Sequence, residues 1–147
     1  LEKLAAQLGI SHRVHFAGHA PESYLKQQLT RASVFAMPSR AELQSIATME
    51  AMASGLPVIG ANAMALPHLI HDGENGFLYE PGDVDQFAAL LTRVFTMPHD
   101  ELLELKRESL HIVQGHDINR TLDTFEALYR GEPVIDPVVD DIDALAP

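Results

Sequence analysis

Residues 37–59 read MPSRAELQSIATMEAMASGLPVI, and this stretch contains the strongest indication of the fold class. Its first residue ends a largely apolar run, 33–37, which predicts a short buried strand. Residues 45–54 then form a compact helical stretch that Gly55 closes, a frequent residue at helix ends. A second apolar run follows at 57–59. The order of strand, loop, helix and strand predicts one unit of a parallel α/β sheet.

Two carboxylates lie eight residues apart in this stretch, Glu42 in the loop and Glu50 in the helix. Because the helix is expected to begin near Ser45, the amides of Ser45, Ile46 and Ala47 have no partner within it. They present a positive helix end to an anion, such as a diphosphate. Glu50 could bind ribose hydroxyls and Glu42 could meet sugar hydroxyls. On the spacing alone, a carboxylate on the capping side of the helix for Glu42 and a solvated helix residue for Glu50 are equal alternatives. The sequence neighbours of Glu50 are apolar, where an unpartnered carboxylate is costly, so the pattern predicts a role for it.

The same alternation extends along the chain. Further strands are expected at 13–17 and 77–79, and further helices at 1–9, 21–31, 66–71, 83–95, 100–109 and 119–129, with Asp83 as a helix cap. Short apolar strands between helices indicate a parallel sheet covered on both faces, an α/β fold of the three-layer, Rossmann-like kind. Ligands of such sheets bind at the carboxyl ends of the strands, so the site is expected in the loops there.

Composition narrows the functional classes. The chain has 147 residues, 46% of them apolar, which predicts one globular domain. A net charge of −11 argues against a nucleic-acid-binding surface and against a basic membrane anchor. The absence of Cys excludes disulfides and favours a cytoplasmic location. The chain opens on a helix without an initiator Met, which we expect of a piece of a longer protein.

The stretch 37–59 resembles the E-x7-E signature of the group 1 retaining glycosyltransferases, which have the GT-B fold. Segments 14–18, 69–78 and 81–83 resemble that family's flanking motifs, in its order and at its spacing. The resemblance implies a partial nucleotide-sugar-binding domain over residues 1–131, the C-terminal half of a GT-B fold with its first strands missing. An acidic tail is expected over residues 132–147.

The resemblance also implies roles for individual residues. Glu50 would bind the nucleotide ribose, and Glu42, as the catalytic residue, would contact the transferred sugar. Catalysis would rest on positioning and on stabilising the leaving diphosphate, with no covalent nucleophile, no cofactor and no metal. The other donor-binding residues that it implies are Ser45, Ile46 and Ala47 at the distal phosphate, and His19 and Ala20 beside the base.

The sequence departs from the family pattern in three ways. Residues 43–45 read Leu-Gln-Ser where the family often has Pro-Phe-Gly, and a side chain at Ser45 limits how closely the backbone can approach a donor. His68 stands where the family often has Glu. The family's phosphate-binding Arg and Lys and its acceptor domain are expected upstream of Leu1, so this fragment is expected to bind donors weakly and to lack turnover.

Three other patterns have simpler interpretations. Asp83 and Asp85 match a D-x-D metal motif, but a helix cap with a first-turn carboxylate explains them better. His68 and His71 lie three apart without a third ligand beside them in sequence, so no metal site is expected. Arg40 is a candidate for the donor phosphates, and a local ion pair with Glu42 is an equal alternative.

The chain is therefore predicted to be the donor domain of a glycosyltransferase that binds a UDP- or GDP-hexose. In the intact protein, cytoplasmic or membrane-associated, the hexose would pass with retention to a glycan or glycolipid acceptor held by the missing N-terminal domain. One alternative is a GT-B-fold sugar-nucleotide epimerase, whose additional catalytic carboxylates and His are not found. The other is a degenerate, non-catalytic nucleotide-binding or interaction module.

Overall fold

The computed structural model describes residues 1–133 and contains a parallel three-stranded sheet. Its strands are β1 (Phe35–Met37), β2 (Val58–Ala61) and β3 (Gly76–Tyr79), in the spatial order β1-β2-β3. Val58 is paired with Phe35 on one side and with Gly76 on the other. The α/β class and the parallel sheet predicted from the sequence are thus confirmed.

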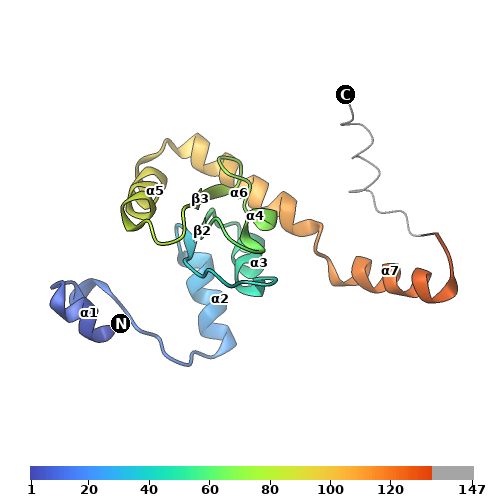
Figure 1. Ribbon diagram of the computed structural model, residues 1–147, viewed down its shortest axis with the longest axis horizontal. Helices are drawn as coiled ribbons and strands as arrows, with labels where there is room; N and C mark the ends of the chain where they lie inside the picture. Colours follow the sequence, from blue (N-terminus) through green and yellow to red (C-terminus); the bar gives the residue numbers. More distant parts are fainter. Residues whose placement is uncertain (134–147) are drawn as a thin grey trace.

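Helices surround the sheet. Figure 1 shows the sheet between α5 on one side and α3, α4 and α6 on the other, with α1 and α7 extending from the body in opposite directions. The helices are α1 (Glu2–Gln7), α2 (Glu22–Arg31), α3 (Ile46–Ala53), α4 (Leu66–Leu69), α5 (Val84–Thr96), α6 (His99–Gln114) and α7 (Ile118–Arg130), with a short 3-10 turn η1 at Ser11–Arg13.

The alternation of side chains along β3 determines what covers each face. Phe77 and Tyr79 point towards α5: the Tyr79 and Phe87 rings are 5.0 Å apart, and the Arg93 guanidinium lies 4.3 Å from the centre of the Phe77 ring. On the other face, Gly60 of β2 leaves room for Ile70, whose side chain would collide with a methyl group there. The buried core joins both faces and includes Met52, Val58, Ile59, Leu66, Leu69, Ile70, Phe77, Tyr79, Val94 and Leu105.

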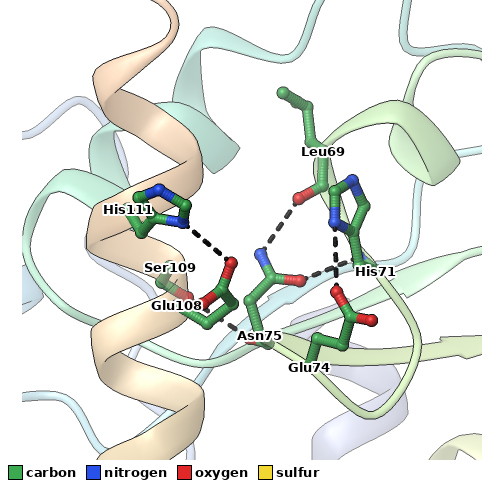
Figure 2. Close-up of polar contacts among 7 residues, drawn as sticks. All are labelled: Leu69, His71, Glu74, Asn75, Glu108, Ser109 and His111. Atoms are coloured by element: carbon green, nitrogen blue, oxygen red, sulfur yellow. Dashed lines mark hydrogen bonds and ion pairs between the residues drawn. The ribbon is translucent and has the colours of Figure 1, made fainter. Parts of the chain in front are cut away.

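Two buried polar residues fix the amino end of the sheet (Figure 2). The Ser109 hydroxyl of α6 donates to the carbonyls of Leu56 (2.8 Å) and Asn75 (3.3 Å). The Asn75 side chain donates to the Leu69 carbonyl (3.0 Å) and accepts from the His71 amide (2.8 Å). Asn75 therefore ties the segment between α4 and β3 into a closed loop, with its polar atoms satisfied.

The strand predicted at 13–17 is wrong. Residues 11–13 form η1, and residues 14–17 have no regular structure. Val14 and Phe16 are more than a third exposed, and within residues 1–133 no strand pairs with this segment. A strand needs a neighbour to satisfy its backbone, and an apolar alternation does not supply one.

Other details follow the prediction more closely. Asp83 caps α5 by accepting from the Gln86 amide at 2.8 Å. Helix α4 is shorter than expected and α6 is longer. The acidic tail expected at 132–147 falls, after its first two residues, outside the described part of the chain, so the boundary at residue 131 stays a prediction.

Candidate functional site at the carboxyl edge of the sheet

Three loops meet at the carboxyl edge, because parallel strands end on the same side. They are residues 38–45 after β1, 62–65 after β2 and 80–83 after β3. The Ala65 amide donates to the Glu42 carbonyl (3.1 Å), which joins the first loop to the second. The Asn62 amide donates to the Tyr79 carbonyl (2.8 Å) and its side chain to the Glu80 carboxylate (3.4 Å), which joins the second loop to the third.

The first loop ends at Ser45, which caps α3 in an unusual conformation. Ser45 has φ +54° and ψ +63°, in the left-handed region, and is 6% exposed. Its carbonyl accepts from the amides of Thr48 (3.0 Å) and Met49 (3.2 Å), which starts the helix. Within residues 1–133, the amides of Ile46 and Ala47 have no hydrogen-bond acceptor. The predicted open helix end is present.

Glu50 lies on the exposed side of α3, so the apolar surroundings expected from its sequence neighbours are wrong. Successive helical residues point about 100° apart, so Ala51 and Met52 face the core while Glu50 faces solvent. Its position beyond the open amides still allows it to meet a ribose, which stays a prediction.

A cation lies close to Glu50. Lys26 of α2 forms an ion pair with Glu22 at 2.6 Å. The hydrogen bond to Glu22 and the charge of that carboxylate raise the pKa of Lys26, and the charge of Glu50 adds to the increase. The same ion pair lowers the pKa of Glu22. Both side chains are exposed, so water screens this cluster and its contribution to stability is small.

Glu42 and Arg40, although close in sequence, lie in different surroundings. Glu42 is half-buried, with its backbone fixed by Ala65. Arg40 instead lies across the turn after β3, where a methyl group on Gly82 would come within 2.6 Å of a guanidinium nitrogen. It lines a hollow of about 240 Å³ with Pro38, Tyr79, Gly82, Asp83, Val84 and Phe87. The alternative of an Arg40–Glu42 ion pair is therefore wrong for residues 1–133 as the structure describes them.

His19 and Ala20 are not brought to this edge. They lie in the irregular segment before α2, which Figure 1 shows running from the body towards α1. No hydrogen bond of the described residues joins either of them to the three loops. Within residues 1–133 no strand pairs with this segment, and the expected contact with a base stays a prediction.

Half of the histidines gather elsewhere. His68, His71, His111 and His116 line a hollow of about 670 Å³ between α4 and the C-terminal part of α6. Figure 2 shows His71 paired with Glu74 (3.4 Å) and His111 with Glu108 (3.1 Å). In the part of the chain that the structure describes, no three His, Asp or Glu side chains are grouped so as to hold a metal ion. Nor does any helix there combine the length and the apolar character needed to span a membrane.

Two residues at the carboxyl edge were not predicted from the sequence. Thr48, fully buried in α3, places its hydroxyl 2.7 Å from that of Ser45. Met64, in the second loop, has φ +52° and is exposed. Ser45 and Met64 are the non-glycine residues with positive φ among residues 1–133, and such strain is common at functional sites. A Ser with a Thr three positions later was a visible signal for the first, whereas nothing in the sequence marks Met64.

Comparison with known protein families agrees with this geometry. Residues 1–109 match the family model of glycosyl transferases group 1. The chain is 41% identical over 100 residues to the MMP alpha-(1->4)-mannosyltransferase of Mycolicibacterium hassiacum, covering 67% of this chain and 24% of that enzyme. It is 38% identical over 91 residues to a D-inositol 3-phosphate glycosyltransferase of Streptomyces scabiei, covering 62% of this chain and 20% of that enzyme. The chain thus spans about a quarter or less of these relatives.

Solved structures show the same likeness. Sucrose-phosphate synthase from Thermosynechococcus elongatus matches 88% of this chain and 33% of its own, with a TM-score of 0.81 and 27% identity. The Anabaena HepE protein in complex with UDP-glucose matches 77% of this chain and 30% of its own, with a TM-score of 0.71 and 25% identity.

A third structure is itself a single domain. The C-terminal domain of a glycosyl transferase group 1 family protein from Francisella tularensis matches 80% of this chain and 60% of its own, with a TM-score of 0.68 and 28% identity. Family model, relatives and structures agree, and the chain belongs to the group 1 glycosyltransferases, as part of the C-terminal, donor-binding domain of their GT-B fold.

Proposed function

We propose that the carboxyl edge of the sheet binds a UDP- or GDP-hexose and that the full-length protein transfers the hexose, with retention, to a glycan or glycolipid. The open amides of Ile46 and Ala47 carry this proposal, because they lie between the two carboxylates of the E-x7-E spacing. Unpartnered amides at a helix start favour an anion, and a diphosphate supplies one. HepE, crystallised with UDP-glucose, is a structural relative that supports UDP.

Each residue then has a chemical task. The amides of Ile46 and Ala47 hold the distal phosphate and stabilise the charge that develops on the leaving diphosphate. Glu50 accepts hydrogen bonds from the ribose, and Glu42 contacts the hexose, positioning it for transfer. Arg40 lies in the same loop, two residues before Glu42, and adds a positive charge at this edge of the sheet for the diphosphate. This chemistry uses no metal and no protein nucleophile.

The acceptor site and the location of the reaction are properties of the whole protein. The acceptor binds to a part of the protein outside this chain, and the reaction takes place in the cytoplasm, at a membrane if the acceptor is a glycolipid. A degenerate nucleotide-binding module is the second candidate, and Ser45, where the family often has glycine, favours it, because a residue with a side chain is strained in the left-handed conformation at this helix start.

Replacing Glu50 with alanine tests the donor site. We expect Glu50→Ala to weaken nucleotide-sugar binding by about 1.5–3 kcal/mol, the usual loss for hydrogen bonds to a charged group. That loss corresponds to roughly a 10- to 150-fold increase in Kd. Calorimetric titration of the full-length protein with UDP-, GDP- and ADP-sugars measures this loss of affinity and identifies the base.

The matched control is Glu101→Ala, which removes an exposed helical carboxylate from the first turn of α6. It should leave donor affinity unchanged. If a folded Glu50→Ala protein binds donors as tightly as the wild type, Glu50 does not belong to the site. If no nucleotide binds to a folded wild-type protein, the degenerate module replaces the transferase.

A further inference from the structure

Ser45 adopts a backbone conformation that its side chain disfavours. A residue with a Cβ atom is strained at φ +54°, and such strain persists only where the surroundings enforce it. Ser45 is nevertheless buried, at the start of a helix whose first amides are open. Some neighbouring group must hold it there.

Thr48 is that neighbour. The Thr48 side chain is completely buried, with 0% exposure, so neither solvent nor a ligand can touch it. Its hydroxyl lies 2.7 Å from the Ser45 hydroxyl. A serine at a helix cap ordinarily uses its side chain to accept from an amide of the first turn. Ser45 makes no such bond, because its hydroxyl is turned inward to Thr48. The Ala47 amide, which such a bond could reach, is thereby left open beside that of Ile46, the first amide of the helix.

We propose that Thr48 is a positioning residue of the donor site. Its hydroxyl holds Ser45 in the left-handed conformation, with the serine side chain directed away from the ligand. The amides of Ile46 and Ala47 then remain available to the diphosphate although residue 45 carries a side chain. This inference rests on the proposed donor-binding function and assigns to a buried residue, which cannot touch the donor, control over its affinity.

A double-mutant cycle tests the coupling. Thr48→Val removes the hydroxyl at nearly constant volume, so Ser45 loses its anchor and can relax from the strained conformation. Ser45→Gly removes both the strain and the need for an anchor. We expect Thr48→Val to weaken UDP or GDP binding about tenfold when residue 45 is serine, and less than about twofold in the Ser45→Gly background.

The measurement is an NMR titration of the isotope-labelled 147-residue chain with UDP and with GDP, following the amide signals of Ile46 and Ala47. Thr48→Ser keeps a hydroxyl and should restore the wild-type affinity. If Thr48→Val does not fold, by circular dichroism, Ser45→Ala removes the same hydroxyl pair from the other side and should weaken binding similarly.

Two results would overturn the inference. Equal losses in both backgrounds would mean that Thr48 acts through core packing, and no loss in either would mean that it does not act on the site. Glu50→Ala, titrated in parallel, separates this failure from that of the proposed function. If Glu50→Ala weakens binding while Thr48 and Ser45 act independently, only the positioning role is lost. If the wild type binds neither UDP nor GDP, or if Glu50→Ala binds them as tightly as the wild type, the positioning role and the proposed donor site are both rejected.

Discussion

Gly76→Ala is expected to destabilise the protein strongly, because the first residue of β3 has no room for a side chain. A methyl group there would collide with the Val58 carbonyl oxygen and lie 2.7 Å from its carbon and 2.9 Å from the Val58 amide nitrogen. These atoms belong to the backbone of β2 and cannot rotate away, so the pairing of Val58 with Gly76 must open. We expect a loss of about 3 kcal/mol or more, the upper end for overpacking.

Urea unfolding followed by circular dichroism measures this loss, since the chain contains no Trp for fluorescence. Gly9→Ala is the control: Gly9 has φ +69°, but nothing lies within 4 Å of the added methyl group. It should cost only the backbone strain, about 1 kcal/mol. Gly60→Ala should lose an intermediate amount of stability, because its added methyl group meets the terminal carbon of the Ile70 side chain rather than backbone atoms. Equal midpoints for Gly76→Ala and Gly9→Ala would show that β2 and β3 can separate at little cost.

The elements that the sequence predicted correctly are those determined by local chemistry. Apolar runs at 33–37, 57–59 and 77–79 are too short for core helices and became the three strands. Asp83 caps α5 because its carboxylate reaches an amide three residues away. The strand expected at 13–17 failed because a strand also requires a partner, and local pattern carries no information about one.

In the candidate site, too, the features set by local chemistry were predicted and those set by tertiary contacts were not. The open amides at Ile46 and Ala47 follow from the helix start alone and were predicted. The surroundings of Glu50 were not, because its neighbours in sequence point to other sides of α3. The contact of Arg40 with Gly82 joins the loops after β1 and β3, which are more than 40 residues apart in sequence and separated by β2 in the sheet, so no local pattern predicts it. Asn75 precedes Gly76 in a dipeptide that is typical of exposed turns, yet Asn75 is fully buried.

Asn75→Ala should have the second large effect on stability, because it breaks two hydrogen bonds at once. The Leu69 carbonyl loses its donor at 3.0 Å and the His71 amide its acceptor at 2.8 Å, and Leu69 is buried. A buried polar group without a partner costs about 1–3 kcal/mol, so we expect a loss of about 3 kcal/mol in urea unfolding. The loss should not change between pH 7 and pH 5, because alanine does not titrate.

Asn75→Asp distinguishes lost hydrogen bonds from lost volume. The new carboxyl group can still accept from the His71 amide, but its second oxygen faces the Leu69 carbonyl. Burial and this repulsion raise the pKa of the introduced group in the folded state above its unfolded value of about 3.9. Its protonated form donates to Leu69 as the amide does, so the penalty is largest above the folded-state pKa. The stability gap to wild type at matched pH should narrow as the pH falls towards 4. A gap that stays constant, as for Asn75→Ala, would mean that the Leu69 carbonyl finds another donor and that Asn75 stabilises the loop by its shape.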